Sequence, residues 1–170
     1  MLKTFVAGAA AALTLTGLAL AVPQKDTVDL EATLKARFEV PKPVGVRTGA
    51  VGLFTGKAVE LENDRATLTW RLTFSKLTGP AAAAHIHVGR AGKAGGVMVA
   101  LCGPCRNGQR GTATITHAKL RKIRAGLTYV NVHTAKNAAG EIRGQVKSSE
   151  IASGSGSGPP LPPPPPPPYP

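Results

Sequence analysis

Apolar and polar residues alternate along most of the chain between Val28 and Ile151, and this period of two predicts β-strands. The longest alternating stretch covers residues 28–40 and ends at Pro41 and Pro43. The clearest half-buried strand covers residues 68–74, where Leu, Trp, Leu and Phe alternate with Thr and Arg. The pattern therefore predicts a domain built mainly from strands.

Further stretches of the same kind complete the pattern, at residues 49–61, 83–88, 97–101, 112–116, 127–134 and 141–146. Glycines within 49–61 indicate β-bulges, and the Glu-Asn-Asp-Arg sequence that follows predicts a hairpin turn. The one helical candidate covers residues 117–125, with Gly126 as its C-cap. Seven or eight strands with almost no helix indicate a sandwich or a barrel. We expect an all-β fold, an antiparallel Greek-key β-sandwich with one short helical segment.

Both ends of the chain differ from this domain, which we place at residues 28–151. Residues 1–21 combine Lys3, an apolar stretch and a small-x-small sequence at Ala19–Ala21, which is typical of a secretory signal peptide. A retained membrane anchor is the alternative, although the stretch is shorter than the ~20 residues of a spanning helix. After cleavage no transmembrane span is expected, and the protein would be secreted or reside in the periplasm or cell envelope.

The C-terminal residues 152–170 predict a Gly/Ser linker followed by a disordered, proline-rich tail. Each proline ring fixes φ and removes a hydrogen-bond donor, so the tail is expected to be an extended polyproline II segment. It would serve as a spacer or as a ligand for an aromatic-lined groove.

The chain is strongly basic, with 21 Lys and Arg against nine Asp and Glu and a net charge of +12. Such a charge suits an anionic partner. Base stacking is not expected, because aromatic residues are scarce and Trp70 and Phe74 belong to the predicted core, which argues against nucleic acid. A cell-envelope protein or an anionic envelope polymer fits better. No phosphate-binding loop, Ser–His–acid order or paired carboxylates indicate a hydrolase.

The only two cysteines, Cys102 and Cys105, lie three residues apart in a Cys-Gly-Pro-Cys sequence. In an exported protein this pair predicts a structural disulfide. A thioredoxin-type redox pair is the alternative, but the turn sequence that follows offers no helix to lower a thiol pKa.

Three of the four histidines occupy positions that suggest a metal site. His85 and His87 flank Ile86 in a strand, so their side chains leave the same face with Cβ atoms ~7 Å apart. If Val130 and Val132 face the core, His133 lies on the opposite face of its own strand. We predict that His85, His87 and His133 converge on one outward, solvent-facing patch, with His117 as a candidate fourth ligand. Imidazoles without a thiolate suit copper(II) or zinc. The alternative is that these histidines only form hydrogen bonds.

Three segments that contain these residues resemble the CHRD domain, a module named from chordin that also occurs in secreted bacterial proteins. They are WRLTFSKLTG at 70–79, AAHIHVGRAGKAGGVMVALC at 83–102 and LTYVNVHTAKNAAGEIRGQV at 127–146. The resemblance covers roughly residues 28–146 and implies export and a β-fold. In chordin these domains belong to an extracellular antagonist of growth factors, so a non-catalytic interaction module of an envelope assembly is one expectation.

The histidine pattern is also similar to that of copper/zinc superoxide dismutase, which has a His-x-His strand in a Greek-key sandwich. That similarity implies His85, His87 and His133 as copper ligands and Arg143 as the catalytic guanidinium that draws superoxide to the metal. The similarity favours copper over zinc as the metal of these three histidines, and the chain departs from that enzyme in having no His/Asp cluster that resembles its zinc subsite. We therefore expect a copper-binding protein with superoxide dismutase-like activity, and superoxide as its small anionic substrate.

Overall fold

The computed structural model describes residues 26–151. The predicted signal peptide at 1–21 and the predicted linker and tail at 152–170 lie outside the described residues. Within the described part, no helix combines the length and apolar character needed to cross a membrane.

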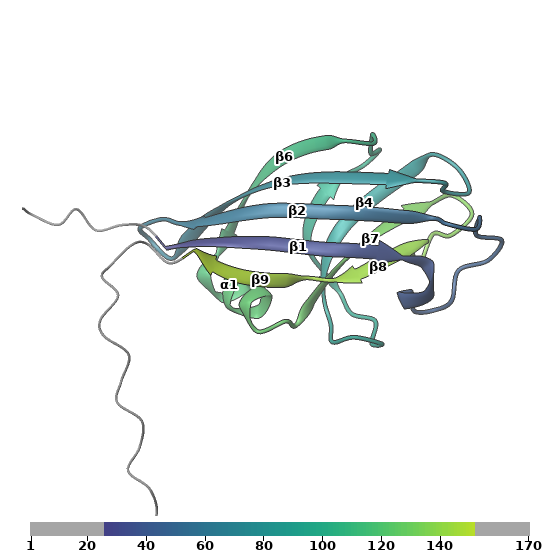
Figure 1. The fold of residues 1–170 in the computed structure, drawn as a ribbon. Helices are drawn as coiled ribbons and strands as arrows, with labels where there is room; N and C mark the ends of the chain where they lie inside the picture. The colour runs from purple at the N-terminus through teal and green to yellow at the C-terminus, as the bar shows by residue number, and fades with distance from the viewer. Residues whose placement is uncertain (1–25, 152–170) are drawn as a thin grey trace, which may run out of the picture.

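Nine strands, one α-helix and one 3-10 turn make up the described chain (Figure 1). The helix α1 is His117–Arg124 and the 3-10 turn is Ala36–Phe38. The strands are β1 (Thr27–Lys35), β2 (Val51–Glu60), β3 (Arg65–Ser75), β4 (Ala81–Val88), β5 (Val97–Cys102), β6 (Gln109–Thr116), β7 (Thr128–Thr134), β8 (Ile142–Gln145) and β9 (Lys147–Ile151). The predicted all-β class and the single short helix are confirmed.

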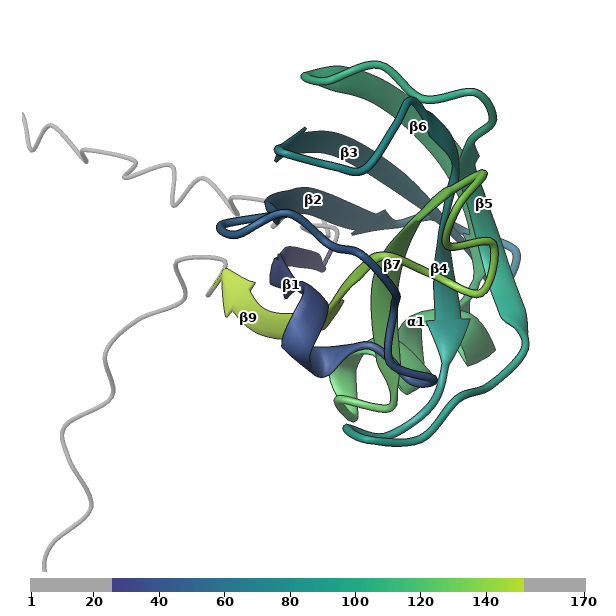
Figure 2. The same cartoon turned by 90° about the vertical axis from the view of Figure 1, so that its right-hand side faces the viewer.

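The strands form one antiparallel sheet in the order β5-β4-β7-β8-β1-β2-β3-β6, and β9 also pairs with β1. Figure 2 shows this sheet curled so that β6, β3, β2 and β1 lie across from β5, β4 and β7. The strand count exceeds the expected seven or eight because a further strand, β9 at Lys147–Ile151, follows the last predicted stretch at 141–146.

The core fills the space between the two halves of the curled sheet. It is built from alternate residues of the strands, including Leu34 on β1, Phe54 on β2, Leu72 on β3 and Ile86 on β4, each with no exposed surface. The helix α1 adds Leu120 and Ile123 to the same cluster. Apolar burial of this kind contributes roughly 25 cal/mol per Å². Because one face of each strand is committed to this core, the other face is free to carry polar groups.

Two sequence predictions are wrong in detail. The first strand ends at Lys35 and not at Val40, because the chain turns through the 3-10 segment. The turn exposes Phe38 and buries Glu39 instead, with exposed fractions of 44% and 1%. The predicted bulges in the second strand are absent, since β2 pairs with both neighbours in unbroken register. Gly52 instead leaves room for the Ile142 side chain, because a Cβ at position 52 would lie only 2.9 Å from Ile142 Cδ1.

The irregular pairing lies in β4 instead, and it falls beside the histidines. The β4–β5 register shifts between Ala84 and His85 and again between Ile86 and His87. Pairing of these residues with β7 on the other side continues from Ala83 to Val88. The geometry of the His-x-His segment is therefore set by β7 more than by β5.

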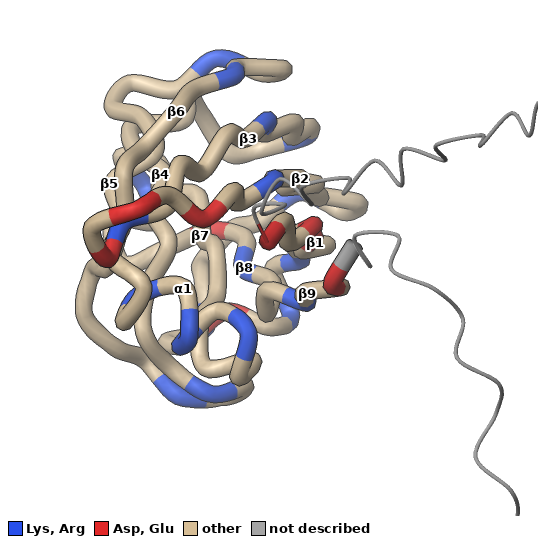
Figure 3. The backbone as a smooth tube through the Cα atoms, turned by 90° about the vertical axis from the view of Figure 1, so that its left-hand side faces the viewer, with Lys and Arg blue, Asp and Glu red and all other residues tan. Residues whose placement is uncertain are grey.

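The predicted hairpin turn after β2 is confirmed, and a side chain caps the start of α1. The β2–β3 hairpin turns at Asn63 and Asp64, both with positive φ, which is the conformation that such turns require. The helix α1 begins after Thr116, whose side chain accepts a hydrogen bond from the Lys119 amide. Acidic residues gather along the β2–β3 turn near α1 (Figure 3), and Arg124 of the helix pairs with Glu60 and Glu150.

The predicted disulfide is present between Cys102 and Cys105, with Cα atoms 5.2 Å apart. It closes the loop after β5, and the Cys105 amide donates to the Ala81 carbonyl at the start of β4. A disulfide is consistent with an oxidising compartment.

Candidate metal centre

His85, His87 and His133 lie on the outer face of the two neighbouring strands β4 and β7. Their strand neighbours Ala84, Ile86, Val130 and Val132 are in the core, as the alternation predicted. In the register, His133 lies opposite Ala83, and His85 lies opposite Asn131. His133 is two residues beyond Asn131 on β7, so its side chain is on the same face and lies diagonally beside that of His85.

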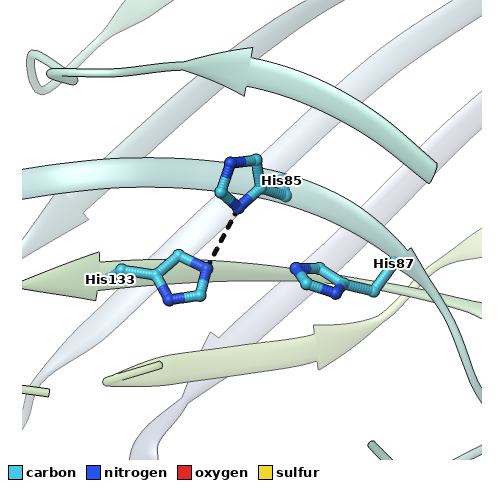
Figure 4. Close-up of side chains that lie close together, drawn as sticks. All are labelled: His85, His87 and His133. Atoms are coloured by element: carbon cyan, nitrogen blue, oxygen red, sulfur yellow. Dashed lines mark hydrogen bonds between the residues drawn. The ribbon is translucent and has the colours of Figure 1, made fainter. Parts of the chain in front are cut away.

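The three imidazoles form one compact group (Figure 4). One nitrogen from each residue lies within 4.8 Å of the other two. The ring centroids are separated by 5.5 Å for His85 and His87, 5.0 Å for His85 and His133, and 6.0 Å for His87 and His133. Since metal–imidazole bonds are ~2.0–2.1 Å long, the widest pair must approach by about 1 Å to hold one ion. Side-chain rotation supplies movements of that size, so the predicted convergence is confirmed.

Backbone carbonyls fix the orientation of two of the rings. His87 Nδ1 lies 2.9 Å from the Gly95 oxygen, and His133 Nδ1 lies 2.9 Å from the Ala138 oxygen. A carbonyl only accepts, so each Nδ1 carries a proton and each Nε2 of the neutral ring has its lone pair available. A hydrogen bond from the second ring nitrogen is the usual support of a metal-binding histidine.

The third ring, that of His85, forms a hydrogen bond with the Nε2 lone pair of His133. His85 Nδ1 lies 3.1 Å from His133 Nε2, and we assign His85 as the donor because His133 Nδ1 already donates. The Nε2 of His87 has no hydrogen-bond partner within the described chain, although it is buried. In Figure 4 the His87 ring points towards the other two imidazoles. A buried lone pair of this kind favours a cation beside it.

The surroundings keep these imidazoles in the form that binds metal. Burial lowers the pKa of His85 below its ordinary value of 6.5, and the nearby His133 and His87 lower it further. Burial likewise lowers the pKa of His133, and it outweighs the hydrogen bond to the Ala138 carbonyl. Metal coordination requires neutral imidazole, so the site is prepared for binding at neutral pH.

The expectation that this face is open to solvent is wrong at its centre. His87, Tyr129 and Asn131 are exposed by only 8%, 3% and 2%, whereas His85 and His133 are half-buried. The loop of residues 89–96 covers His87 and Tyr129 and supplies Gly95 to both. The Gly95 amide donates to the Tyr129 hydroxyl at 3.1 Å. The candidate centre is therefore a partly covered site with one protected ligand.

Only glycine fits at position 95 of this loop. A Cβ there would lie 1.7 Å from the Val88 carbonyl oxygen, far inside any real contact. Residues 89–96 contain four glycines, but nothing in the sequence indicates that the carbonyls of this loop orient side chains. The partners of the His triple that sequence reasoning missed are thus Gly95, Ala138 and Tyr129.

Arg143 was expected to guide an anion to the metal, and the structure places it beyond Tyr129. Its side chain is 1% exposed, and its Cζ atom lies 3.3 Å from the centroid of the Tyr129 ring. Strand β7 lies between β4 and β8, so Tyr129 lies between His87 and Arg143. The guanidinium donates to the carbonyls of Arg90 and Lys93 in the 89–96 loop.

Two other titratable residues, His117 and Glu141, are not part of this triple. His117 begins α1, where it contacts Asp64 and Glu60 and lies 2.9 Å from the Arg65 carbonyl, and it is not part of the His cluster. The Glu141 carboxylate is fully buried and accepts hydrogen bonds from Thr78, Thr134 and Asn137. The geometry therefore leaves three imidazoles as the ligand set among the described residues.

The sequence was also compared with known proteins. Residues 30–146 match the CHRD domain, which is more than half of the chain. The chain belongs to the CHRD domain family. No curated protein matches the chain, and no solved structure matches it. The matched region of the CHRD domain contains every strand from β2 to β8 and all four histidines.

Proposed function

We propose that this CHRD protein is an exported copper-binding protein whose metal site supports superoxide dismutation. The observation that carries the proposal is the buried Nε2 of His87, which has no hydrogen-bond partner among the described residues and points towards two further imidazoles. A ligand set of neutral imidazoles without thiolate or carboxylate suits copper(II) better than calcium or magnesium.

Each histidine has a defined task in this proposal. His87 and His133 would bind through Nε2, because their Nδ1 protons are held by the carbonyls of Gly95 and Ala138. His85 would release its hydrogen bond to His133 and present a lone pair, with its proton on the other ring nitrogen. No proton leaves the site in this step, so the changes within the site are loss of the His85–His133 hydrogen bond and the closer approach of the imidazoles.

Bound copper would supply a one-electron couple that oxidises one superoxide to oxygen and reduces a second, with two protons, to hydrogen peroxide. The chain would leave at least one coordination position for the anion, since three residues provide ligands. A net charge of +12 favours the approach of a small anion from solution. Arg143 acts in this proposal only through that long-range field, because Tyr129 separates it from the imidazoles.

Zinc is the other metal that this ligand set would accept, as a site with three histidines and one open position. Zinc has no redox chemistry, so zinc in the protein would exclude dismutation while retaining the metal site.

The test is metal analysis of the purified mature protein after incubation with copper or zinc and desalting. We expect about one copper per chain in the wild-type protein, and none retained by His87→Ala or His133→Ala. His117→Ala is the matched control, since it removes an imidazole outside the cluster and should keep the metal. Dismutation should disappear with a chelator and return with copper. Failure to take up copper at micromolar concentration would refute the proposal.

A second candidate is a non-catalytic interaction module that joins a cell-envelope protein or an anionic polymer. The observation in its favour is the exposure of Val51 and Leu53, at 36% and 40%, on the outer face of β2. Binding of an envelope partner that survives His87→Ala but not Leu53→Lys would support this alternative. Copper bound without any dismutation would also favour it over the redox function.

A further inference from the structure

A cavity of about 540 Å³ lies away from the His triple, where β1, β8 and β9 meet. None of the three imidazoles lines it. Its walls come from β1, the 3-10 turn and the chain that follows, the tip of the 89–96 loop, β8 and β9. The volume falls within the range of small-molecule sites, ~300–1,000 Å³.

The lining is strongly cationic. It contains one carboxylate, Glu31, and five basic side chains, Lys35, Arg37, Lys42, Arg143 and Lys147. In the tube drawing, basic residues lie along β8 and β9 next to β1 (Figure 3). A concave surface with charges of one sign concentrates ions of the other sign. The ligand that this cavity suits is therefore an anion.

Two of these cations are direct neighbours in the sheet. Lys35 on β1 lies opposite Arg143 on β8 in the register. Like charges in opposite positions of neighbouring strands destabilise a sheet. Within the described residues neither side chain has a carboxylate within 4.0 Å, so a bound anion would remove this repulsion.

Arg143 also retains hydrogen-bonding capacity. Its Nη2 donates to two loop carbonyls, but its buried Nη1 has no partner in the described part of the chain. Glu39 attracts Arg143 electrostatically but forms no salt bridge with it. A buried guanidinium without a paired carboxylate is costly, and an anion at the cavity wall offsets that cost.

The rest of the cavity wall is apolar. The Phe38 ring is 44% exposed, and Val40 and Ala91 lie on the same lining. The Arg37 guanidinium lies 4.8 Å from the centre of the Phe38 ring, so the aromatic and cationic groups are adjacent. An inorganic ion would leave this apolar surface uncovered.

We propose that this cavity binds an amphipathic anion, a molecule with a carboxylate head and an apolar body. The head lies among the basic side chains of the lining, and the body packs on Phe38 and Val40. The site is separate from the copper centre and does not depend on it.

The test uses the purified mature protein in the presence of a chelator, with dodecanoate titrated calorimetrically below its micelle concentration. We expect saturable binding of one dodecanoate per chain. The double variant Lys35→Gln/Lys147→Gln should weaken it roughly tenfold or more, because two cations of the lining are lost. The matched control Arg121→Gln/Lys122→Gln removes the same charge from exposed positions of α1 and should change the affinity by less than about twofold.

Three further measurements decide the chemistry of the ligand. Dodecanol and inorganic phosphate should each bind at least about tenfold more weakly than dodecanoate, because one lacks the charge and the other lacks the apolar body. His85→Ala should bind dodecanoate as the wild type does. Equal binding of dodecanol, equal weakening by the α1 control, or loss of binding in His85→Ala would each overturn the proposal. The absence of saturable dodecanoate binding would overturn it as well.

Discussion

The ring of Tyr129 stacks on the imidazole of His87, with centroids 5.0 Å apart and planes 9° apart. Arg143 contacts the same aromatic ring, so three side chains from β4, β7 and β8 form a continuous row across the sheet. The 89–96 loop covers this row and accepts hydrogen bonds from His87, Tyr129 and Arg143. The orientation of His87, the protected ligand of the candidate metal centre, thus depends on the 89–96 loop.

The loop gives a direct test of this support. Gly95→Ala should displace the Gly95 carbonyl, because the added Cβ would meet the Val88 oxygen at 1.7 Å. We expect copper affinity to fall about 10–100-fold, the usual loss when the hydrogen-bond partner of a metal-binding histidine is removed. Competition with a chromogenic copper chelator measures it. Gly96→Ala is the control, since a Cβ there has no neighbour within 4 Å. Equal affinity in both variants would contradict the role of Gly95.

The Tyr129 hydroxyl should matter for stability more than for the metal. Tyr129→Phe keeps the stacked ring but leaves the Gly95 amide without its acceptor. Loss of one such hydrogen bond destabilises a protein by about 1 kcal/mol, and up to ~3 kcal/mol if the partner stays buried. We expect this change in the free energy of unfolding by urea titration, with copper still bound. Complete loss of copper from Tyr129→Phe would show that the hydroxyl has a larger role in the site.

Glu141 should make stability depend on acid pH. Burial opposes its ionisation, but hydrogen bonds from Thr134, Thr78 and Asn137 outweigh burial and lower its pKa below the usual 4.5. The unfolded chain therefore takes up this proton at higher pH than the folded one. The stabilisation is fully present above pH ~4.5 and is lost as the pH falls through the lower folded pKa.

Glu141→Gln tests this dependence, because it removes the titrating group and keeps the shape. At pH 7 the variant should be less stable by about 2–3 kcal/mol, since charge-assisted hydrogen bonds are replaced by weaker ones. The difference from wild type should shrink between pH 5 and pH 3. Thermal unfolding at several pH values measures it, and a constant difference across that range would contradict the assignment.

The disulfide should contribute modestly to stability. Only two residues lie between Cys102 and Cys105, and closing so short a loop restricts the unfolded chain by only about 2 kcal/mol. Cys102→Ser/Cys105→Ser should lower the melting temperature and leave copper binding intact, since neither cysteine belongs to the His cluster. Failure of the variant to fold at 25 °C would show that the loop has a larger structural role.

Much of this protein follows from its sequence. The alternation of apolar residues correctly predicted the all-β class and the inward faces of β4 and β7. Turn and cap signals correctly predicted the β2–β3 hairpin and the helix near residues 117–124. The same alternation placed His85 and His87 on one outer face, because side-chain direction in a strand depends only on local geometry. These features are local, and a single strand or turn is sufficient to specify them.

Strand order and loop position are not local, and only the tertiary structure determined them. The pairing of β4 with β7 brings His133, 48 residues away, to 3.1 Å from His85. The same topology puts Tyr129 between His87 and Arg143, and the 89–96 loop covers a face that alternation alone assigned to solvent. Alternation distinguishes the two faces of a strand, but it carries no information about which strand lies beside it or which loop folds over it. The sequence therefore gave the proximity of the three imidazoles only as a hypothesis. The antiparallel register of β4 and β7 determines that they lie close together.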